Sequence, residues 1–538
     1  MRILSLVSWG ACGFFFLAGL AFVPLPGIQN DEALFSAPLY ESAYEYGALT
    51  VFGRKIPLLL ISYLGALKTW ISWLVFKIAR PSGWSVRLPV LFAGTLTVWL
   101  FWRLAERLGG TRAAVIGALL LATDAMFVLT TVLDWGPVAL QHLFLVAAMV
   151  LALRFHDTGS RGALFGVFLL LGLAVWDKAL FLWLLGGLVV AALAVVPGEL
   201  RRAFSWRRTS LAALAFCLGA WPVIYHNLMS SGETVRANAS FTLDELGSKA
   251  MALERALAGK ALFGYVVGEA WFDLPRLPKT GLQRISVWVS ELAGEPRSSV
   301  FPWIVLLAAL CVPHVWHTRA RRPAVFSIVL LLVAWFQMAV TQRAGASVHH
   351  VVLLWPIPHL LVALVFAELS RRFGRAGVAG VTLAAVLTWG SSFLSLNQYH
   401  SQLVRYGAPS VWSDAIFTLS HRLRQASADH IFMMDWGMID NVRMLARGGL
   451  PIHVGMDAVD KDRPDPALFQ RMIELPNSVF VSFTERWEQT EGVNRRLTAL
   501  TAQLGYRIES VELVKDRNGR PVFQIARIAR DRIPAAVQ

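Results

Sequence analysis

Long apolar segments recur along most of the chain and are separated by short polar loops. An α-helix rises about 1.5 Å per residue, so about 20 apolar residues span the hydrocarbon core of a bilayer. We therefore predict a polytopic α-helical membrane protein with about eleven transmembrane helices. These helices are expected at residues 3–23, 88–106, 113–133, 136–153, 162–176, 179–197, 209–228, 299–316, 324–341, 350–367 and 376–395.

The first outer loop, residues 24–87, contains a further apolar stretch of a different kind. Residues 56–79 carry Lys68, Trp73 and Lys77 among apolar positions. Tryptophan prefers the headgroup depth of a bilayer, and lysine side chains reach from an apolar face to water. We expect an amphipathic helix in the membrane interface, because a twelfth crossing here would place the arginine-rich loops outside the cell.

The pattern changes after the last apolar segment. Apolar and polar residues alternate at 430–434, 478–482 and 521–526, as in half-buried strands, and helix-like periods lie between them. We therefore predict two domains, a membrane domain of residues 1–395 and an extracytoplasmic α/β domain of residues 396–538.

A second outer segment, residues 229–298, combines acidic residues with a helix-like period at 243–262. This pattern predicts a partly ordered lid on the outer side.

Arginine is distributed unevenly over the loops. One set of alternate loops has fifteen arginines and four acidic residues. Short cytoplasmic loops collect positive charge, so this set is predicted to be cytoplasmic. We expect a bacterial inner-membrane protein with a cytoplasmic N-terminus and a periplasmic C-terminus. Most of the formal net charge of +15 is then a topology signal, and no nucleic-acid partner is needed to explain it.

The composition agrees with a membrane protein. Hydrophobic residues make up 56% of the chain and charged residues 16%, whereas about 25% of the residues of a soluble domain are charged. The three cysteines, Cys12, Cys217 and Cys311, all lie in apolar segments. No disulfide framework or cysteine-rich metal site is therefore expected.

Charged and strongly polar residues gather at the predicted outer ends of the helices. Any one of them is more often a helix cap or an interfacial anchor than a catalytic residue. Acids and bases mixed on one side of the membrane, however, suit an anionic ligand held beside a general base. The set consists of Asp31, Glu32, Lys55, Asp134, Asp177, Lys178, Arg343, His349 and His350.

The order of these features resembles that of the membrane-embedded GT-C glycosyltransferases. The motifs are Asp31-Glu32 after the first helix, Arg54-Lys-Ile-Pro57, Asp134-Trp-Gly-Pro137, Asp177-Lys178 and His349-His-Val-Val-Leu-Leu-Trp-Pro-Ile-Pro358. Over about residues 1–395, the chain is similar to the protein O-mannosyltransferase and lipid A aminoarabinose transferase group, glycosyltransferase family 39.

The resemblance implies an inverting transfer of a sugar, hexosyl or pentosyl, from a polyprenyl-phosphate donor. The acceptor would be a hydroxyl group of a cell-envelope glycolipid, polysaccharide or protein on the outer face of the membrane. A lipid-linked donor agrees with the absence of a nucleotide-binding motif from the sequence. The expected partners are the donor, membrane lipid and the acceptor, with no nucleic acid. No definite cofactor is implied, and a divalent metal ion is left open.

The resemblance also implies roles for individual residues. It makes Asp31, Glu32 and Asp134 catalytic, with Asp31 as the base. The family has Lys-Pro-Pro where this chain has Lys55 followed by Ile56 and a proline, so the local turn is less constrained here. The residues implied to bind the donor phosphate are Lys55, Lys178, Arg343, His349 and His350.

The charge balance of the reaction supports these roles independently. A sugar phosphodiester carries about one negative charge, and the monoester that leaves carries about 1.5–2 at pH 7. Cations beside the phosphate therefore stabilise the transition state more than the ground state. A carboxylate on the opposite face of the anomeric carbon can accept the proton of the acceptor hydroxyl.

Two other functions fit part of the pattern. A transporter or flippase of lipid-linked sugars would also have many helices, but it should carry charges near the middle of its helices and often contains repeats. The sequence shows no internal repeat. A receptor that uses the membrane domain as an anchor would need far fewer crossings.

Overall fold

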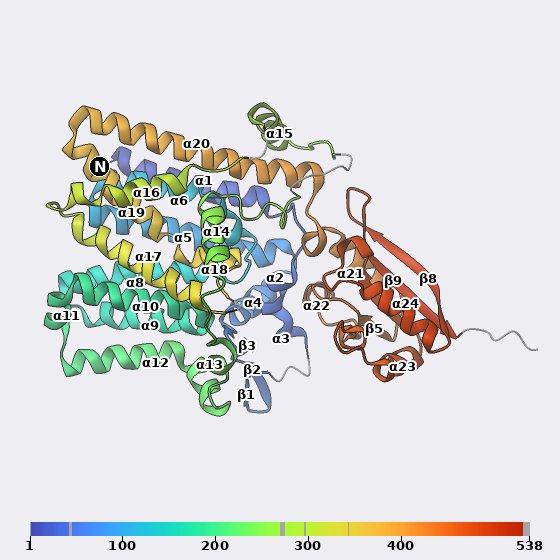
Figure 1. Ribbon diagram of the computed structural model, residues 1–538. Coiled ribbons are helices and arrows are strands. Elements are labelled where there is room, and N and C mark those ends of the chain that lie inside the picture. The colour runs from blue at the N-terminus through green and yellow to red at the C-terminus, as the bar shows by residue number, and fades with distance from the viewer. Residues whose placement is uncertain (1, 42–45, 269–274, 295–296, 343, 531–538) are drawn as a thin grey trace, which may run out of the picture.

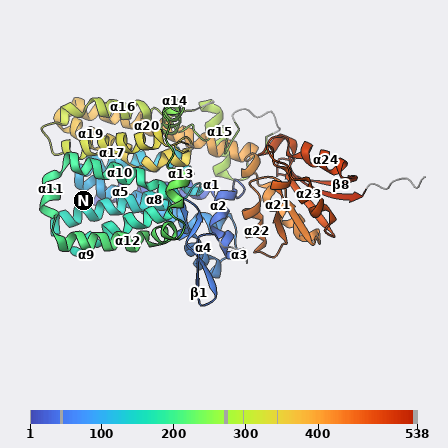
Figure 2. The same cartoon turned by 60° about the horizontal axis from the view of Figure 1, so that its bottom comes forward.

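The computed structural model describes residues 2–41, 46–268, 275–294, 297–342 and 344–530. Helices form an elongated bundle, a small α/β unit lies beyond one end of it, and the short elements of the first outer loop lie between the two (Figure 1). Figure 2 shows the same order of parts after rotation. Residues 27–30 of this loop contact the C-terminal part of the chain, whereas the hairpin of residues 48–57 projects from the molecule (Figures 1 and 2).

Each of the eleven predicted transmembrane segments is helical. Within the described residues, six helices are long and apolar enough to cross a membrane, or eight if two bent pairs each count as one span. The helices of the bundle are α1 (Arg2–Phe22), α5 (Gly83–Gly109), α6 (Thr111–Thr123), α7 (Ala125–Val132), α8 (Val138–Thr158), α9 (Arg161–Asp177), α10 (Leu182–Val195), α12 (Trp206–Met229), α16 (Phe301–Leu310), α17 (Arg321–Val340), α18 (Val348–Val351), α19 (Ile357–Arg372) and α20 (Gly374–Tyr406). The number of crossings stays a prediction.

Helix α19 forms the centre of the bundle. It packs against α5, α6, α16, α17 and α20, and the apolar part of the span Val348–Arg372 is entirely buried. In a bilayer an apolar helix can face either lipid or other helices, and these five neighbours place α19 inside the bundle. Helix α20, in contrast, leaves most of its apolar surface exposed.

Two bends interrupt long helical segments. Helices α6 and α7 meet at 57°, where the Asp124 carboxylate accepts the backbone N–H of Phe127 at 2.8 Å and caps α7. Helix α10 and α11 (Pro197–Ala203) meet at 99°. Proline has no N–H to donate and favours the first position of a helix, so Pro197 ends one helix and opens the next.

The first outer loop contains more strand than the sequence analysis predicts. Its elements are α2 (Asn30–Ala33), α3 (Ala37–Tyr40), β1 (Ala48–Val51), β2 (Arg54–Pro57), β3 (Leu59–Ile61), β4 (Leu64–Gly65) and α4 (Leu67–Ile78). Strands β1 and β2 form one antiparallel hairpin, and β3 pairs with β4. The prediction of one helix over residues 56–79 is therefore wrong for nearly half of its length, up to the start of α4 at Leu67, because a short apolar run suits a strand as well as a helix.

The α/β unit contains one mixed sheet of five strands in the order β6-β5-β7-β9-β8. Strand β5 pairs in parallel with β6 and β7, whereas β9 is antiparallel to β7 and β8. Its elements are α21 (Ala415–Gln425), β5 (His430–Met433), α22 (Ile439–Ala446), β6 (Ile452–Val454), α23 (Pro466–Glu474), β7 (Ser478–Phe483), α24 (Val493–Gln503), β8 (Tyr506–Lys515) and β9 (Pro521–Arg530). Helix α20 runs to Tyr406, so the bundle extends past residue 395, where the sequence analysis ends it.

The second outer segment is helical in its described parts, with α13 (Glu233–Asn238), α14 (Leu246–Leu257) and α15 (Gly281–Ala293). Helix α14 is fixed to the bundle by Lys249, a buried residue. Its ammonium group donates to the carbonyl oxygens of Ala339 at 3.1 Å and Thr341 at 2.5 Å, at the end of α17. Helix α15 packs against α20 (Figure 1).

Candidate active site

Helix α2 carries the acidic pair Asp31-Glu32 at the end of the bundle that faces the α/β unit (Figure 1). Gln29 caps this short helix, since its side chain accepts the Asp31 N–H at 2.5 Å while the Glu32 carboxylate accepts the Gln29 N–H at 2.9 Å. In this reciprocal capping box, Asp31 is held through its backbone N–H and Glu32 through its side-chain carboxylate. Glu32 points into the protein and is buried, and Asp31 is half-buried.

Glu32 forms a buried ion pair with Arg87 of α5. The Nε and Nη2 atoms of Arg87 each lie 2.7 Å from a different carboxylate oxygen of Glu32. The same guanidinium group donates to the carbonyl oxygens of Val23 at 2.7 Å and Gly27 at 2.6 Å. Because both oxygens of Glu32 are occupied, this geometry fits a positioning role for Glu32 better than direct chemistry.

The Asp31 carboxylate accepts a hydrogen bond from the Trp135 indole N–H at 3.2 Å. Burial raises the pKa of Asp31 above its ordinary value. The indole N–H of Trp135, the side-chain amide of Gln29 and the positive charges of Lys178 and Lys68 oppose this rise. Asp31 therefore binds a proton more tightly than an ordinary aspartate does. Lys178 and Lys68 act on its carboxylate electrostatically, although neither forms an ion pair with it.

Asp134 pairs with Lys68, and both side chains are buried. The Lys68 ammonium also lies 3.6 Å from the centre of the Phe35 ring. Burial raises the pKa of Asp134 to about 6, against the opposing charge of Lys68. Lys68 is a site residue that the sequence analysis misses, because a lysine on an amphipathic helix also suits the membrane interface.

The turn Asp134-Trp135-Gly136 shapes the site through its backbone. Asp134 has a φ of +48° and Gly136 of +69°, in the left-handed region that most side chains avoid. A Cβ atom at Gly136 would collide with the ring of His349. The glycine therefore lets α18 approach and keeps Trp135 beside Asp31.

Asp177 and Lys178 lie behind this turn and are fully buried. The Lys178 ammonium donates to the carbonyl oxygen of Gly136 at 2.8 Å, and the Asp177 carboxylate accepts from the Gln141 amide at 2.7 Å. The structure thus brings a second lysine to the back of the Asp31 site.

Aromatic rings from three distant segments surround Trp135. The Tyr265 ring stacks on it with centroids 4.6 Å apart, and the His349 ring lies at 4.6 Å. Trp412, which leads into the α/β unit and is fully buried, meets Trp135 edge-on at 6.3 Å. Nothing in the local sequence around Tyr265 or Trp412 marks them, because their contact depends on how the parts fold together.

The α/β unit holds the loop that carries Asp31. The backbone N–H of Gly27 donates to the carbonyl oxygen of Trp412 at 2.7 Å. Asn30 and Asp440 exchange two hydrogen bonds, at 3.2 and 3.1 Å, and Asn441 donates to the carbonyl oxygen of Ile28 at 3.0 Å. Helix α22 is therefore part of the support of the site.

The remaining predicted phosphate ligands differ in their location. His350 is buried, and its Nδ1 accepts the Gly345 N–H at 3.1 Å. Lys55 is exposed on the β1–β2 hairpin, which projects from the molecule in both views (Figures 1 and 2). Arg343 lies outside the described residues. The structure thus brings together Asp31, Glu32, Asp134, Asp177, Lys178, His349 and His350, and it places Lys55 on a different element.

Several buried polar atoms of this cluster have no hydrogen-bond partner within the described part of the chain. A buried polar group without a partner costs about 1–3 kcal/mol, so a group of them marks a place where a polar ligand or water binds. These atoms are Gln29 Nε2, Asp134 Oδ1, Asp177 Oδ1, His349 Nδ1, His350 Nε2 and Trp412 Nε1. Among the described residues, no group of three or more His, Cys, Asp or Glu side chains is arranged to hold a metal ion.

One family model matches part of the chain. It is described as dolichyl-phosphate-mannose-protein mannosyltransferase and matches residues 65–226. This range includes Lys68, Arg87, Asp134 and Lys178, whereas Asp31 precedes it. No curated protein is similar enough in sequence to count as a match.

Solved structures match nearly the whole chain in fold. ArnT from Cupriavidus metallidurans, bound to undecaprenyl phosphate, is 13% identical with a TM-score of 0.57, and the match covers 97% of each chain. The apo oligosaccharyltransferase of Archaeoglobus fulgidus is 14% identical with a TM-score of 0.52, over 97% of this chain and 74% of that chain. The mycobacterial arabinofuranosyltransferase AftD is 16% identical with a TM-score of 0.50, over 98% and 40%. The chain therefore has the GT-C fold of membrane glycosyltransferases, which confirms the resemblance of its motifs.

Proposed function

We propose that this protein is an inverting glycosyltransferase that moves a sugar from a polyprenyl-phosphate carrier to a hydroxyl group of a cell-envelope acceptor. The single observation that carries the proposal is the position of Asp31. It is a half-buried carboxylate with a raised pKa, next to Trp135, at the end of a bundle with the GT-C fold. ArnT was solved with undecaprenyl phosphate and the Archaeoglobus enzyme with a dolichol-phosphate, so a lipid-phosphate carrier is the donor class with the most support.

Asp31 is the proposed general base. The acceptor hydroxyl gives its proton to the carboxylate as its oxygen forms a bond to the anomeric carbon. The bond from that carbon to the phosphate oxygen breaks, the electron pair stays with the phosphate monoester, and the anomeric configuration inverts. A carboxylate with a raised pKa accepts a proton more readily than an ordinary aspartate.

Cations stabilise the leaving phosphate in this proposal. Lys178 and Lys68 both act on the Asp31 carboxylate electrostatically, so both lie within reach of charge that develops at this site. Among the described residues, the Lys178 ammonium donates only to the carbonyl oxygen of Gly136. Burial lowers the pKa of Lys178 to about 7, so an anion bound beside it would stabilise its charged form. His349, His350, Arg343 and Lys55 remain proposed phosphate ligands on the strength of the sequence motifs.

Glu32 and Asp134 are proposed to position other groups. Glu32 anchors α2 to Arg87 and thereby fixes the Asp31 backbone. Asp134 orients Lys68, and its neighbour Trp135 donates to Asp31. Tyr265 stacks on Trp135 and is partly exposed, so its ring provides the apolar surface near the carboxylate against which the sugar is proposed to lie.

The test is chemical turnover by the full chain reconstituted in vesicles. A polyprenyl-phosphate sugar is added on the outer side with an envelope extract as acceptor, and mass spectrometry follows the lipid. We expect the sugar-bearing lipid to be converted to polyprenyl phosphate, with the sugar recovered on the acceptor. A transporter would instead move the intact lipid between leaflets, and the amount of that lipid would not change.

A further inference from the structure

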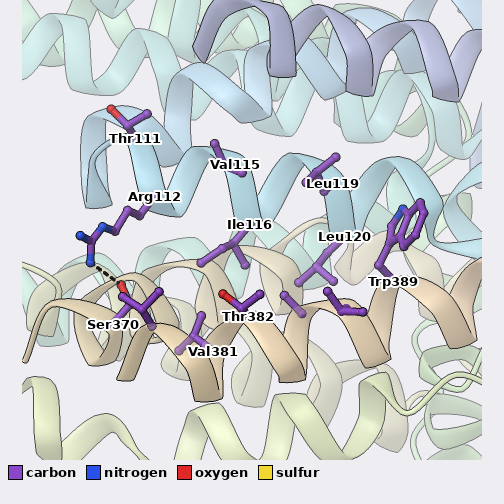
Figure 3. A pocket seen from close by; sticks show the side chains of 13 residues that line it. Thr111, Arg112, Val115, Ile116, Leu119, Leu120, Ser370, Val381, Thr382 and Trp389 are labelled. Carbon is purple, nitrogen blue, oxygen red and sulfur yellow. Dashed lines mark hydrogen bonds between the residues drawn. The ribbon is translucent and has the colours of Figure 1, made fainter. Parts of the chain in front are cut away.

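A long apolar groove lies between α6 and α20, in the half of the bundle remote from the α/β unit (Figure 3). Its volume is about 710 Å³. Ile116 and Leu120 of α6 form one wall, and Val381 and the exposed ring of Trp389 on α20 form the other. The groove belongs to no part of the Asp31 site.

Arginines gather at one end of this groove. Arg112 donates to the Ser370 hydroxyl at 2.9 Å (Figure 3), and Arg371 pairs with Glu368 at 2.8 Å. Arg375 is exposed and makes no ion pair or hydrogen bond within the described part of the chain. These three arginines line a second cavity of about 600 Å³ that adjoins the groove. The end of the groove therefore carries more positive charge than Glu368 can balance.

The groove is one leaflet long. From Val378 to Trp389 it follows α20 for about 16 Å at 1.5 Å per residue, and half of a bilayer's hydrocarbon core is about 15 Å. The arginines then lie at headgroup depth. This is the side that the distribution of loop arginines predicts to be cytoplasmic.

We propose that this groove binds an anionic glycerophospholipid of the adjacent leaflet. An acyl chain lies between α6 and α20, and the headgroup phosphate contacts the Arg112 and Arg375 guanidinium groups. Guanidinium matches phosphate in shape and charge, and the excess positive charge favours a headgroup that is negative overall over a zwitterionic one. A polyprenyl phosphate is a poorer fit, because its chain is far longer than one leaflet and its phosphate would lie at the end of the bundle opposite Asp31.

The experiment uses the full chain in micelles with equal amounts of phosphatidylglycerol and phosphatidylcholine. Native mass spectrometry then counts the lipids that stay bound. We expect preferential retention of phosphatidylglycerol, and a loss of about fivefold in that preference for Arg375→Ala, since one arginine near a charged surface contributes ~1 kcal/mol. Ala385→Phe, which fills the groove without a change in charge, should also lower the retention.

The matched control is Arg161→Ala, which removes an exposed arginine at the start of α9, outside the groove. It should retain lipid like the wild type. Equal retention of the two lipids by the wild type, an equal loss in Arg161→Ala, or displacement of the bound phosphatidylglycerol by added polyprenyl phosphate would each contradict the proposal. Arg375 has no ion pair or hydrogen bond to lose within the described residues, so its variant is expected to fold. Lipid retention is read without turnover, so the result is independent of the proposed reaction.

Discussion

The Asp31 carboxylate lies 3.2 Å from the Trp135 indole nitrogen, although the whole of α5, α6 and α7 separates the two residues in the chain. This hydrogen bond joins the two motifs, Asp31-Glu32 and Asp134-Trp-Gly-Pro137, that the sequence presents separately. It also makes the ionised form of Asp31 more stable than burial alone would allow.

Trp135→Phe should lower turnover and move its pH dependence. The variant keeps a ring that packs on Tyr265 but loses the N–H that stabilises the Asp31 carboxylate, so the pKa of Asp31 should rise further. A base must be deprotonated to act, so the acidic limb of the kcat/KM profile should move to higher pH. The comparison is with Trp84→Phe, which alters an exposed tryptophan of α5 and should leave the profile unchanged.

Arg87→Met should destabilise the protein by about 3–5 kcal/mol, the usual cost of removing one partner of a buried ion pair. It leaves Glu32 buried without its partner and the carbonyl oxygens of Val23 and Gly27 without a donor. Thermal unfolding in detergent measures the effect. Arg103→Met breaks an exposed pair with Glu106 and should change stability by less than about 1 kcal/mol. Similar losses in both variants would show that Arg87 has no special structural role.

Asp134 should make stability depend on pH in a definite direction. Its folded-state pKa is about 6, above the ordinary value of 3.8, so the folded protein binds the Asp134 proton more tightly than the unfolded chain does. The contribution of this group to stability should therefore fall as the pH rises from about 4 to about 6, and level off above. The free energy of unfolding of wild type minus that of Asp134→Asn should show this fall. A difference that rises with pH over the same range would contradict the assignment.

Trp412→Ala should lower kcat/KM about 10-fold or more, because it removes one ring of the cluster around Trp135, the residue that donates to Asp31. Trp436→Ala is the matched control, since Trp436 lies in the same unit and is partly exposed. If the two variants behave alike in a turnover assay, the α/β unit acts only as a whole and Trp412 does not shape the site.

The helices of the bundle could be predicted from sequence, because a long apolar segment in a bilayer satisfies its backbone hydrogen bonds by forming a helix. The strands of residues 48–65 could not, since a run such as Leu58 to Ile61 suits a buried strand and a helix equally well. The predicted end of the last helix at residue 395 was too early. The residues from there to Tyr406 pack against α15, and the carbonyl oxygens of Arg405 and Tyr406 at the end of the helix accept hydrogen bonds from Asn518 and Arg520.

The residues of the candidate site could be predicted where they belong to a recognisable sequence motif. Asp31, Asp134 and Lys178 stand in such motifs, and the structure brings them together. Lys68 and Arg87 stand in none. In sequence each is only a cation in the predicted first outer loop, and only the folded chain shows that each pairs with a buried acid.

The measurement that tests the central claim most directly is the turnover of Asp31→Asn. The substitution keeps the volume and the Trp135 contact but removes the capacity to accept a proton, so turnover should fall by about 10²–10⁴-fold while folding and carrier binding persist. Asp462→Asn, at an exposed acid of the α/β unit, should retain full activity. Carrier binding is followed by native mass spectrometry of the same samples. Near wild-type turnover by Asp31→Asn would contradict the assignment of Asp31 as the base.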